Sequence, residues 1–193
     1  MKTVIVYAHP YENSFNHAVL ESIKEGLVEN DERYTVFDLV KDGFNPVMTA
    51  KDLAGYNKGH TDDEIIIKYQ EEIESAHKLI FIFPIWWGGM PAILKGFFEK
   101  VFLKNFCYKI ENGKVVGLLD HIKKTFVFTT SGRDTSTIVN KWGDPIGTTL
   151  PKSTLSVVGL NDYDWINFDR ISKSKKDDRI KYLKKVKDLI INY

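Results

Sequence analysis

The chain has 193 residues, of which 43% are hydrophobic and 27% are charged, and its formal net charge is +1. These values are typical of a globular protein, so we expect residues 1–193 to form a single domain. The near-zero net charge provides no general attraction for nucleic acid or anionic lipid. One cysteine, Cys107, excludes an intrachain disulfide and a cysteine-cluster metal site, and we expect no bound metal.

Two features of the sequence bear on cellular location. The first ten residues, MKTVIVYAHP, lead directly into a strand pattern and lack the charged and then apolar segments of a signal peptide. No apolar run approaches the ~18 residues that are needed to cross a bilayer. We therefore expect a cytoplasmic protein without membrane insertion.

The first part of the chain alternates between strand and helix patterns. Residues 3–8 form a β-branched run that predicts the first strand, and residues 34–40 predict the second. Between them, residues 15–27 carry apolar side chains at a 3.6-residue period, which predicts a helix capped by Asn13 or Ser14.

The next segment combines a loop pattern with a helix start. Residues 43–60 have no clear period and contain glycine, proline and asparagine, so we expect a long surface loop. Residues 61–64, Thr-Asp-Asp-Glu, match a capping box. The following helix is therefore predicted to begin at Thr61 or Asp62 and to run to about residue 76.

The most apolar stretch is residues 79–83, which predicts a strand buried on both faces, as in a parallel sheet. Pro84 ends this strand because proline cannot donate to a sheet ladder. Trp86 and Trp87 follow, and a glycine pair turns the chain before an amphipathic helix near Pro91. Because successive strand residues point to opposite faces, one tryptophan can face a ligand and the other the core or a partner. Burial of both in the core or in a subunit contact is the alternative.

The rest of the chain continues the alternation. A turn at residues 111–114 interrupts an irregular segment, 105–121, and can close a small hairpin. Residues 125–129 predict a fourth strand, and residues 134–151 a second polar, glycine-containing loop. Residues 153–160 predict a fifth strand, and residues 175–191 a closing helix. The closing helix should bury Ile180, Leu183, Val186 and Ile190. Five alternations of strand and helix predict an α/β fold with a doubly wound parallel sheet and helices on both faces.

The first candidate site is the turn between the first strand and its helix. Free backbone N–H groups and the helix dipole at this turn favour an anion such as a phosphate. Ser14 and Asn16 add uncharged donors, and His9 can donate to a phosphate oxygen. The alternatives are a structural role for His9 and simple helix capping by Ser14 and Asn16.

Two more candidates follow later strands at the same predicted edge of the sheet. Thr129, Thr130, Ser131 and Gly132 can offer hydrogen bonds to the polar edge of a heterocycle. Trp142 can wall a pocket or cover the core. Together with the tryptophan pair, these loops provide an anion cradle, an aromatic wall and a polar edge. In open α/β sheets ligands bind at this edge, and the combination suits a flavin.

The same motifs resemble the NAD(P)H:quinone oxidoreductase family of flavodoxin-like flavoenzymes. His9 with Ser14-Phe15-Asn16 looks like the phosphate-binding turn of that family. Residues 84–87, followed by residues 91–96, are similar to its most specific signature. Residues 129–132 resemble its Thr-Thr-Gly-Gly segment, with Ser131 in place of the first glycine.

This resemblance implies a five-stranded sheet of order 2-1-3-4-5 and a flavin cofactor. It assigns the flavin to two groups of residues: the phosphates to His9, Ser14, Phe15 and Asn16, and the ring to Pro84, Ile85, Trp86, Trp87, Gly88, Thr129, Thr130, Ser131 and Gly132. Tyr108 looks like an aromatic residue that covers the flavin of the partner subunit, which implies a homodimer. Trp142 replaces a family histidine, so proton relay through this position is not expected. We assign the catalytic contacts to Trp87, Tyr108 and Trp142.

The expected activity is ping-pong hydride transfer from NAD(P)H through the flavin to a quinone or similar small acceptor. FMN is favoured slightly over FAD, and the choice between NADH and NADPH stays open. Two other functions are weighed against this one. The first is a regulatory flavoprotein that associates peripherally with a membrane transporter, and the second is an electron carrier of the flavodoxin type.

Overall fold

The computed structural model describes the whole chain, from Met1 to Tyr193. Its centre is a parallel sheet in the order β2-β1-β3-β6-β7. These five strands are β1 (Lys2–Tyr7), β2 (Arg33–Asp38), β3 (Lys78–Pro84), β6 (Lys124–Thr130) and β7 (Tyr163–Phe168). With the separate β4–β5 hairpin set aside, this is the predicted order 2-1-3-4-5, so the predicted fold class is confirmed.

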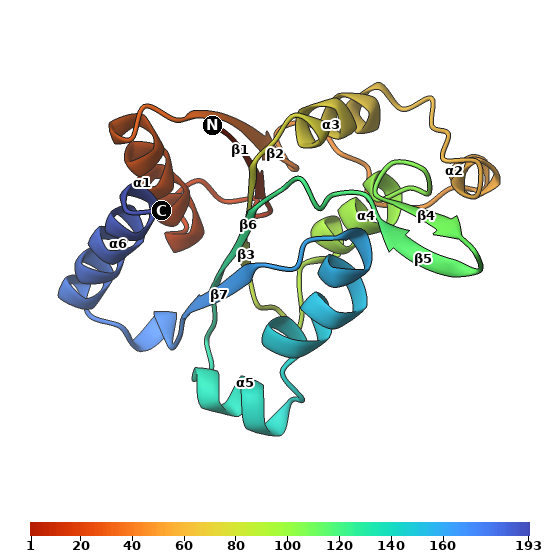
Figure 1. Ribbon diagram of the computed structural model, residues 1–193. Coiled ribbons are helices and arrows are strands. Elements are labelled where there is room, and N and C mark those ends of the chain that lie inside the picture. Colours follow the sequence, from red (N-terminus) through yellow and green to blue (C-terminus); the bar gives the residue numbers. More distant parts are fainter.

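Helices cover both faces of the sheet (Figure 1). The helices α1 (Phe15–Glu29) and α6 (Lys176–Ile191) lie side by side on one face. The helices α3 (Glu64–Glu74) and α4 (Ala92–Val101) pack on the other face. None of the helices is both long and apolar enough to cross a membrane.

The central strand β3 divides the apolar core into two clusters because its side chains alternate between the faces. Ile80 and Ile82 pack with residues of α1 and α6, whereas Phe81 and Phe83 pack with residues of α3 and α4. Every residue of β3 is buried, as expected for a strand in the middle of a parallel sheet.

The predicted fifth strand, residues 153–160, is wrong. This segment forms single helical turns at Pro151–Leu155 and Ser156–Val158, and the fifth strand of the sheet is β7 instead. Pro151 suits the first turn of a helix, and Gly159 ends the turns with a φ of 99°, a left-handed conformation that glycine adopts readily. The apolar residues Leu155 and Val158 are buried from these helical turns rather than from a strand.

The predicted loop over residues 43–60 contains the short helix α2 (Ala50–Tyr56). Thr49 caps α2 in a reciprocal capping box: the Asp52 backbone N–H donates to Thr49 Oγ1 over 3.1 Å, and the Thr49 N–H donates to Asp52 Oδ2 over 2.9 Å.

The predicted start of the next helix is also wrong. Asp63, rather than Thr61 or Asp62, caps α3 by accepting a hydrogen bond from the backbone N–H of Ile65.

Several smaller expectations can be compared directly. Ser14 caps α1, since its side chain accepts from the backbone N–H of His17. The hairpin forms from β4 (Tyr108–Glu111) and β5 (Lys114–Gly117). The polar excursion over residues 134–151 contains α5 (Thr135–Lys141) and a helical turn, Pro145–Thr149. In α6, Val186 and Ile190 are buried as expected, but Ile180 is 53% exposed because it lies on the outer face.

An aromatic cluster on the α4 face allows a test of this core. Phe97 is fully buried, and its ring lies within 6.4 Å, between centroids, of the rings of Phe44, Tyr69, Phe81, Phe98 and Phe102. We expect Phe97→Ala to lower the free energy of unfolding by about 3–5 kcal/mol, since it removes buried surface and leaves a cavity. Urea unfolding followed by far-UV circular dichroism measures the loss. The exposed control Ile180→Ala should change it by less than about 0.5 kcal/mol, and equal losses for the two variants would contradict this packing.

Candidate functional site

Three loops meet at the carboxyl edge of the sheet, and we call them the rim loops: residues 8–14 after β1, 85–91 after β3 and 131–134 after β6. The His9 and Trp86 rings are in edge contact with centroids 5.6 Å apart. The backbone N–H of Ile85 donates to the carbonyl of Thr130 over 2.8 Å. Parallel strands end at one edge of a sheet, and the structure brings the three predicted segments together there.

The first rim loop leaves several donors free. The backbone N–H groups of Phe15 and Asn16 open α1 and have no hydrogen-bond partner within the chain. His9 Nδ1 accepts from the backbone N–H of Tyr11 over 3.1 Å, which leaves Nε2 to carry the proton of the neutral ring. Burial lowers the pKa of His9. A neutral donor and two free N–H groups at a helix N-terminus can hold a phosphate.

The side chain of Asn16 is buried between the first and third rim loops. Its Nδ2 donates to Thr130 Oγ1 over 2.8 Å, so this amide ties α1 to the end of β6 with one of its two N–H donors. Its Oδ1 is buried without a partner. A buried acceptor without a partner costs about 1–3 kcal/mol, and a ligand hydroxyl could satisfy it. The hydroxylated side chain of a flavin would fit this requirement.

The second rim loop is a tight hairpin turn rather than a continuation of β3. Trp86 and Gly89 exchange two backbone hydrogen bonds of 2.9 and 3.0 Å, with Trp87 at φ 50° and Gly88 at φ 79° between them. Trp86 is half-exposed and Trp87 is fully exposed, so strand alternation does not apply and neither indole is in the core. The N–H groups of Trp87 and Gly88 have no partner within the chain.

Trp142 lies next to this turn. A Cβ added to Gly88 would lie 3.7 Å from Cε3 of Trp142, in ordinary contact. Trp142 follows α5 and is half-exposed. Trp87, Gly88 and Trp142 line a hollow of about 450 Å³. Two indoles therefore border an open space, and the role of Trp142 as a pocket wall stays a prediction.

The end of β6 uses its side chains internally. Thr130 faces α1 through its bond to Asn16, whereas Thr129 and Ser131 face the opposite side. There they contact Asn167 of β7, a residue that the sequence analysis missed because it assigned the fifth strand elsewhere. The available signal was the share of aromatic and β-branched residues in Tyr163–Phe168, which favours a strand. In the third rim loop, the backbone N–H of Gly132 has no hydrogen-bond partner within the chain.

Tyr108 lies outside the hollow that Trp87 and Trp142 border. It lines a groove of about 360 Å³ with Tyr56, Met90, Phe98, Phe102 and Leu150, and it does not line the hollow beside Trp87. Burial and the neighbouring Tyr56 raise the pKa of Tyr108 to about 12, so its hydroxyl stays protonated at neutral pH. Cys107 is fully buried, and burial raises the pKa of its thiol to about 12, which argues against a nucleophilic role.

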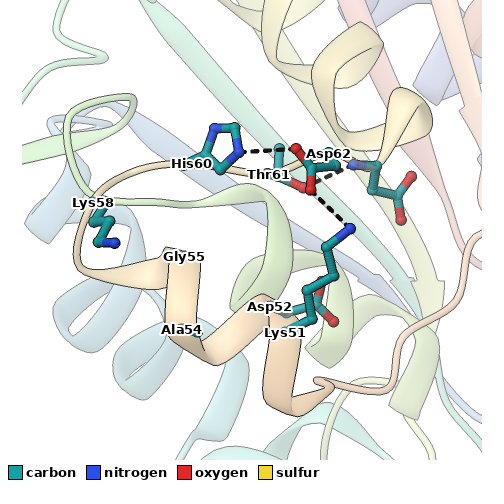
Figure 2. Close-up of a pocket in the computed structure, with 9 residues that line it drawn as sticks. Lys51, Asp52, Ala54, Gly55, Lys58, His60, Thr61 and Asp62 are labelled. Carbon is teal, nitrogen blue, oxygen red and sulfur yellow. Dashed lines mark hydrogen bonds and ion pairs between the residues drawn. The ribbon is translucent and has the colours of Figure 1, made fainter.

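A second polar pocket, of about 420 Å³, lies between α2 and α3 (Figure 2). Figure 2 shows Lys51 and His60 pointing at Asp62: Lys51 Nζ forms an ion pair with one carboxylate oxygen at 2.8 Å, and His60 Nε2 lies 2.9 Å from the other. The buried Lys100 donates to the carbonyl of Asn45 over 3.0 Å nearby. Lysine and aspartate side chains pair with one another here, and the pocket is lined by α2 and by the segment that leads into α3. No cluster of three or more His, Cys, Asp or Glu side chains is placed to hold a metal ion.

Comparison with known proteins agrees with this geometry. A family described as having a flavodoxin-like fold matches residues 1–190. An uncharacterized NAD(P)H oxidoreductase of Haemophilus influenzae is 36% identical over 120 residues, which cover 62% of this chain and 59% of that protein. NAD(P)H dehydrogenase (quinone) 1 of Cavia porcellus is 31% identical over 150 residues, covering 69% of this chain and 54% of that protein. The chain thus spans between half and two thirds of the length of these curated relatives.

Among solved structures, the NAD(P)H:quinone oxidoreductase of Methanothermobacter marburgensis is similar over the whole chain. It is 26% identical, has a TM-score of 0.86, and the alignment covers 100% of this chain and 98% of that one. The resemblance to NAD(P)H:quinone oxidoreductases that the motifs indicated is therefore confirmed.

The state of His9 can be tested by its titration. Burial lowers its pKa below 6.5, so we expect a neutral ring at pH 7 with the proton on Nε2. The neutral form stabilises the fold above pH 6.5, and this contribution is lost as the pH falls through the lower folded-state value. Long-range ¹H–¹⁵N spectra identify the tautomer and the midpoint. In urea-unfolded protein the pKa of His9 should return to about 6.5. A titration midpoint in the folded protein at or above this value would refute the assignment.

Proposed function

Because the chain belongs to the family with the flavodoxin-like fold, we propose that it is a flavin-dependent oxidoreductase that transfers electrons from NAD(P)H to a quinone or similar small acceptor. The observation that carries this proposal is the convergence of the three rim loops. Each loop follows a strand at the same end of the sheet, and backbone N–H groups in the loop or directly after it have no partner within the chain: Phe15 and Asn16 at the start of α1, Trp87 and Gly88, and Gly132. A ligand with an anionic tail and a polar-edged flat ring would satisfy all of them.

The chain would hold the phosphate at the first rim loop. The N–H groups of Phe15 and Asn16, the hydroxyl of Ser14 and the Nε2–H of His9 are the donors. The dipole of α1 adds about 0.3–1 kcal/mol for a negative charge at its N-terminus. When bound, the flavin would supply hydride acceptance from NAD(P)H and a separate, ping-pong transfer to the acceptor.

The other two rim loops would place the ring and admit the second reactant. Backbone N–H groups of Trp87, Gly88 and Gly132 can hydrogen-bond to ring heteroatoms and stabilise negative charge there. The hollow between Trp87 and Trp142 is open to a flat molecule. Indole has no titratable proton near neutral pH, so Trp142 positions a reactant by contact and does not relay a proton.

We favour FMN over FAD as the cofactor. The segment of residues 43–60, which could cover an adenosine or be simple surface, forms α2 and lies against the start of the β4–β5 hairpin (Figure 1). Gly59 is in close contact with the carbonyl of Lys104, and Asn105 Nδ2 donates to the carbonyl of Lys58 over 3.5 Å. Neither contact brings this segment to the phosphate turn.

We also propose that the chain works as a homodimer and that residues 1–193 form one domain in the cytoplasm. The groove around Tyr108 is mostly apolar, and Ile110 and Val115 of the adjoining hairpin are exposed. A second copy that covered this groove would bury them and could bring Tyr108 to the partner's rim loops.

A flavodoxin-type carrier would work as a monomer and is usually acidic, whereas this chain has a net charge of +1. A transporter-associated role would need a membrane partner that co-purifies with the chain.

The activity itself has a direct test. We expect the protein to bind FMN, to lose its yellow absorbance when NADPH or NADH is added without oxygen, and to regain it when a quinone follows. The measurement is the absorbance near 450 nm in a stopped-flow spectrophotometer, about the usual flavin maximum, with free FMN as the control. If neither nicotinamide cofactor bleaches the loaded protein, the proposed reductase activity is wrong.

The phosphate turn can be tested by a change of charge alone. Asp and Asn cap helices about as well as Ser, so Ser14→Asp and Ser14→Asn should both fold. We expect Ser14→Asp to weaken FMN binding at least about tenfold, or ~1.4 kcal/mol, because its carboxylate would repel the phosphate.

Fluorescence titration compares both variants with FMN and with riboflavin, which lacks the phosphate. Ser14→Asn is the neutral control of similar size, and riboflavin affinity should be the same in the two variants. Equal FMN affinities for Ser14→Asp and Ser14→Asn would show that no phosphate binds at this turn.

A further inference from the structure

A connected set of hydrogen bonds lies behind the third rim loop, and Asn167 of β7 is at its centre. Asn167 Oδ1 accepts from Thr129 Oγ1 over 2.9 Å. Its Nδ2 donates to Ser131 Oγ and to Thr135 Oγ1, both over 3.0 Å. The amide therefore uses its acceptor and both donors on three residues that flank the loop.

The partners of Asn167 are held in turn by other groups. Trp165 Nε1 donates to Thr129 Oγ1 over 2.8 Å. Ser131 Oγ donates to the carbonyl of Arg133 over 2.7 Å. The backbone N–H of Thr135 donates to Asp169 Oδ2 over 2.8 Å. Both ends of the segment 131–135 are thereby attached to β7, which is paired with β6 residue by residue up to its end.

This arrangement settles where the side chain of Ser131 lies. Its hydroxyl accepts from Asn167 and donates to Arg133, so it points toward β7. Thr130, one residue earlier, points to α1 through Asn16. The serine side chain at position 131 is thus accommodated behind the loop, and the backbone N–H of Gly132 stays without a partner at the rim.

We propose that Asn167 is a positioning residue of the cofactor site. By fixing Thr129, Ser131 and Thr135 at once, it holds the Gly132 N–H where the polar edge of the flavin ring would lie. This inference rests on the proposed function, because it concerns the same site. Leucine lacks all three hydrogen bonds, and aspartate lacks both donors, so no other side chain of this size reproduces the pattern.

The electrostatic consequence distinguishes positioning from simple structural support. A donor aimed at the ring heteroatoms stabilises the reduced form more than the oxidised form, since reduction adds negative charge there. Misplacing that donor therefore weakens binding of the reduced form preferentially. A tenfold preferential loss corresponds to a fall of about 30 mV in the two-electron reduction potential. A general loosening of the fold would weaken both forms equally and leave the potential unchanged.

The test uses Asn167→Ala, with Tyr163→Phe as the matched control. Tyr163 lies on the same strand and donates to the carbonyl of Gly147 over 3.2 Å, away from the rim loops. We first titrate the wild-type protein with FMN and then measure the affinity and the reduction potential of the bound FMN in each variant. Asn167→Ala should bind oxidised FMN about 5- to 20-fold more weakly and lower the potential by about 30 mV, whereas Tyr163→Phe should change neither.

The outcomes separate the two proposals. Wild-type protein that binds no FMN refutes the proposed function, and with it this inference. Wild-type binding with an unchanged potential in Asn167→Ala refutes the positioning role alone, and so does an equal shift in Tyr163→Phe. If Asn167→Ala does not fold, Ser131→Ala removes one of the three contacts and should still lower the potential. The backbone amide of residue 131 donates to the carbonyl of Phe168 over 3.0 Å, and its faster hydrogen exchange in that variant without FMN would support the same role, whereas unchanged exchange would oppose it.

Discussion

The structure depends on the burial of β3 on both faces and its pairing with β1 and β6 on both edges. A strand in this position has no water to satisfy its backbone, so its hydrogen bonds must all go to its neighbours. Parallel pairing then makes the carboxyl ends of the strands lie together, and the chain leaves the sheet there through loops. The free N–H groups of the rim loops follow from this constraint, because the ladder stops while the backbone continues.

Buried polar groups occur at both ends of the strands, and the buried ion pair lies at the amino end. At the amino edge, the buried Lys78 pairs with the buried Glu32 over 3.0 Å, and Glu32 also accepts from the hydroxyl of Thr3. Charges buried there are satisfied within the chain, as a stable fold requires. At the carboxyl edge, Asn16 Oδ1 and several backbone N–H groups are left without partners. Unsatisfied groups of this kind are costly in a fold and useful at a binding site, and at the carboxyl end of the sheet the side-chain acceptor of Asn16 lies beside the free backbone N–H groups of the rim loops.

The rim loops also differ in how their geometry is maintained. The turn at Trp87 is fixed by two backbone hydrogen bonds and a positive-φ pair, so it depends little on distant residues. The loop after β6 depends on Asn167 from the neighbouring strand. A site built from both kinds of loop combines a locally determined aromatic wall with a polar edge that requires the completed sheet. This division explains why some site residues can be found from local sequence and others cannot.

The sequence by itself determined the parallel α/β architecture, the buried central strand and the segments that form the rim loops. Apolar periodicity, a capping residue at Asn13 or Ser14 and Pro84 after an apolar run are local signals, and each was sufficient to locate its element, although only the structure chose Ser14 as the cap. It did not determine the fifth strand, because the apolar residues of 153–160 pack equally well from helical turns that Gly159 ends. Nor did it determine the partners of Thr129, Thr130 and Ser131. Those contacts join residues 36 to 114 positions apart in the chain, and only the pairing of strands and helices in space decides them.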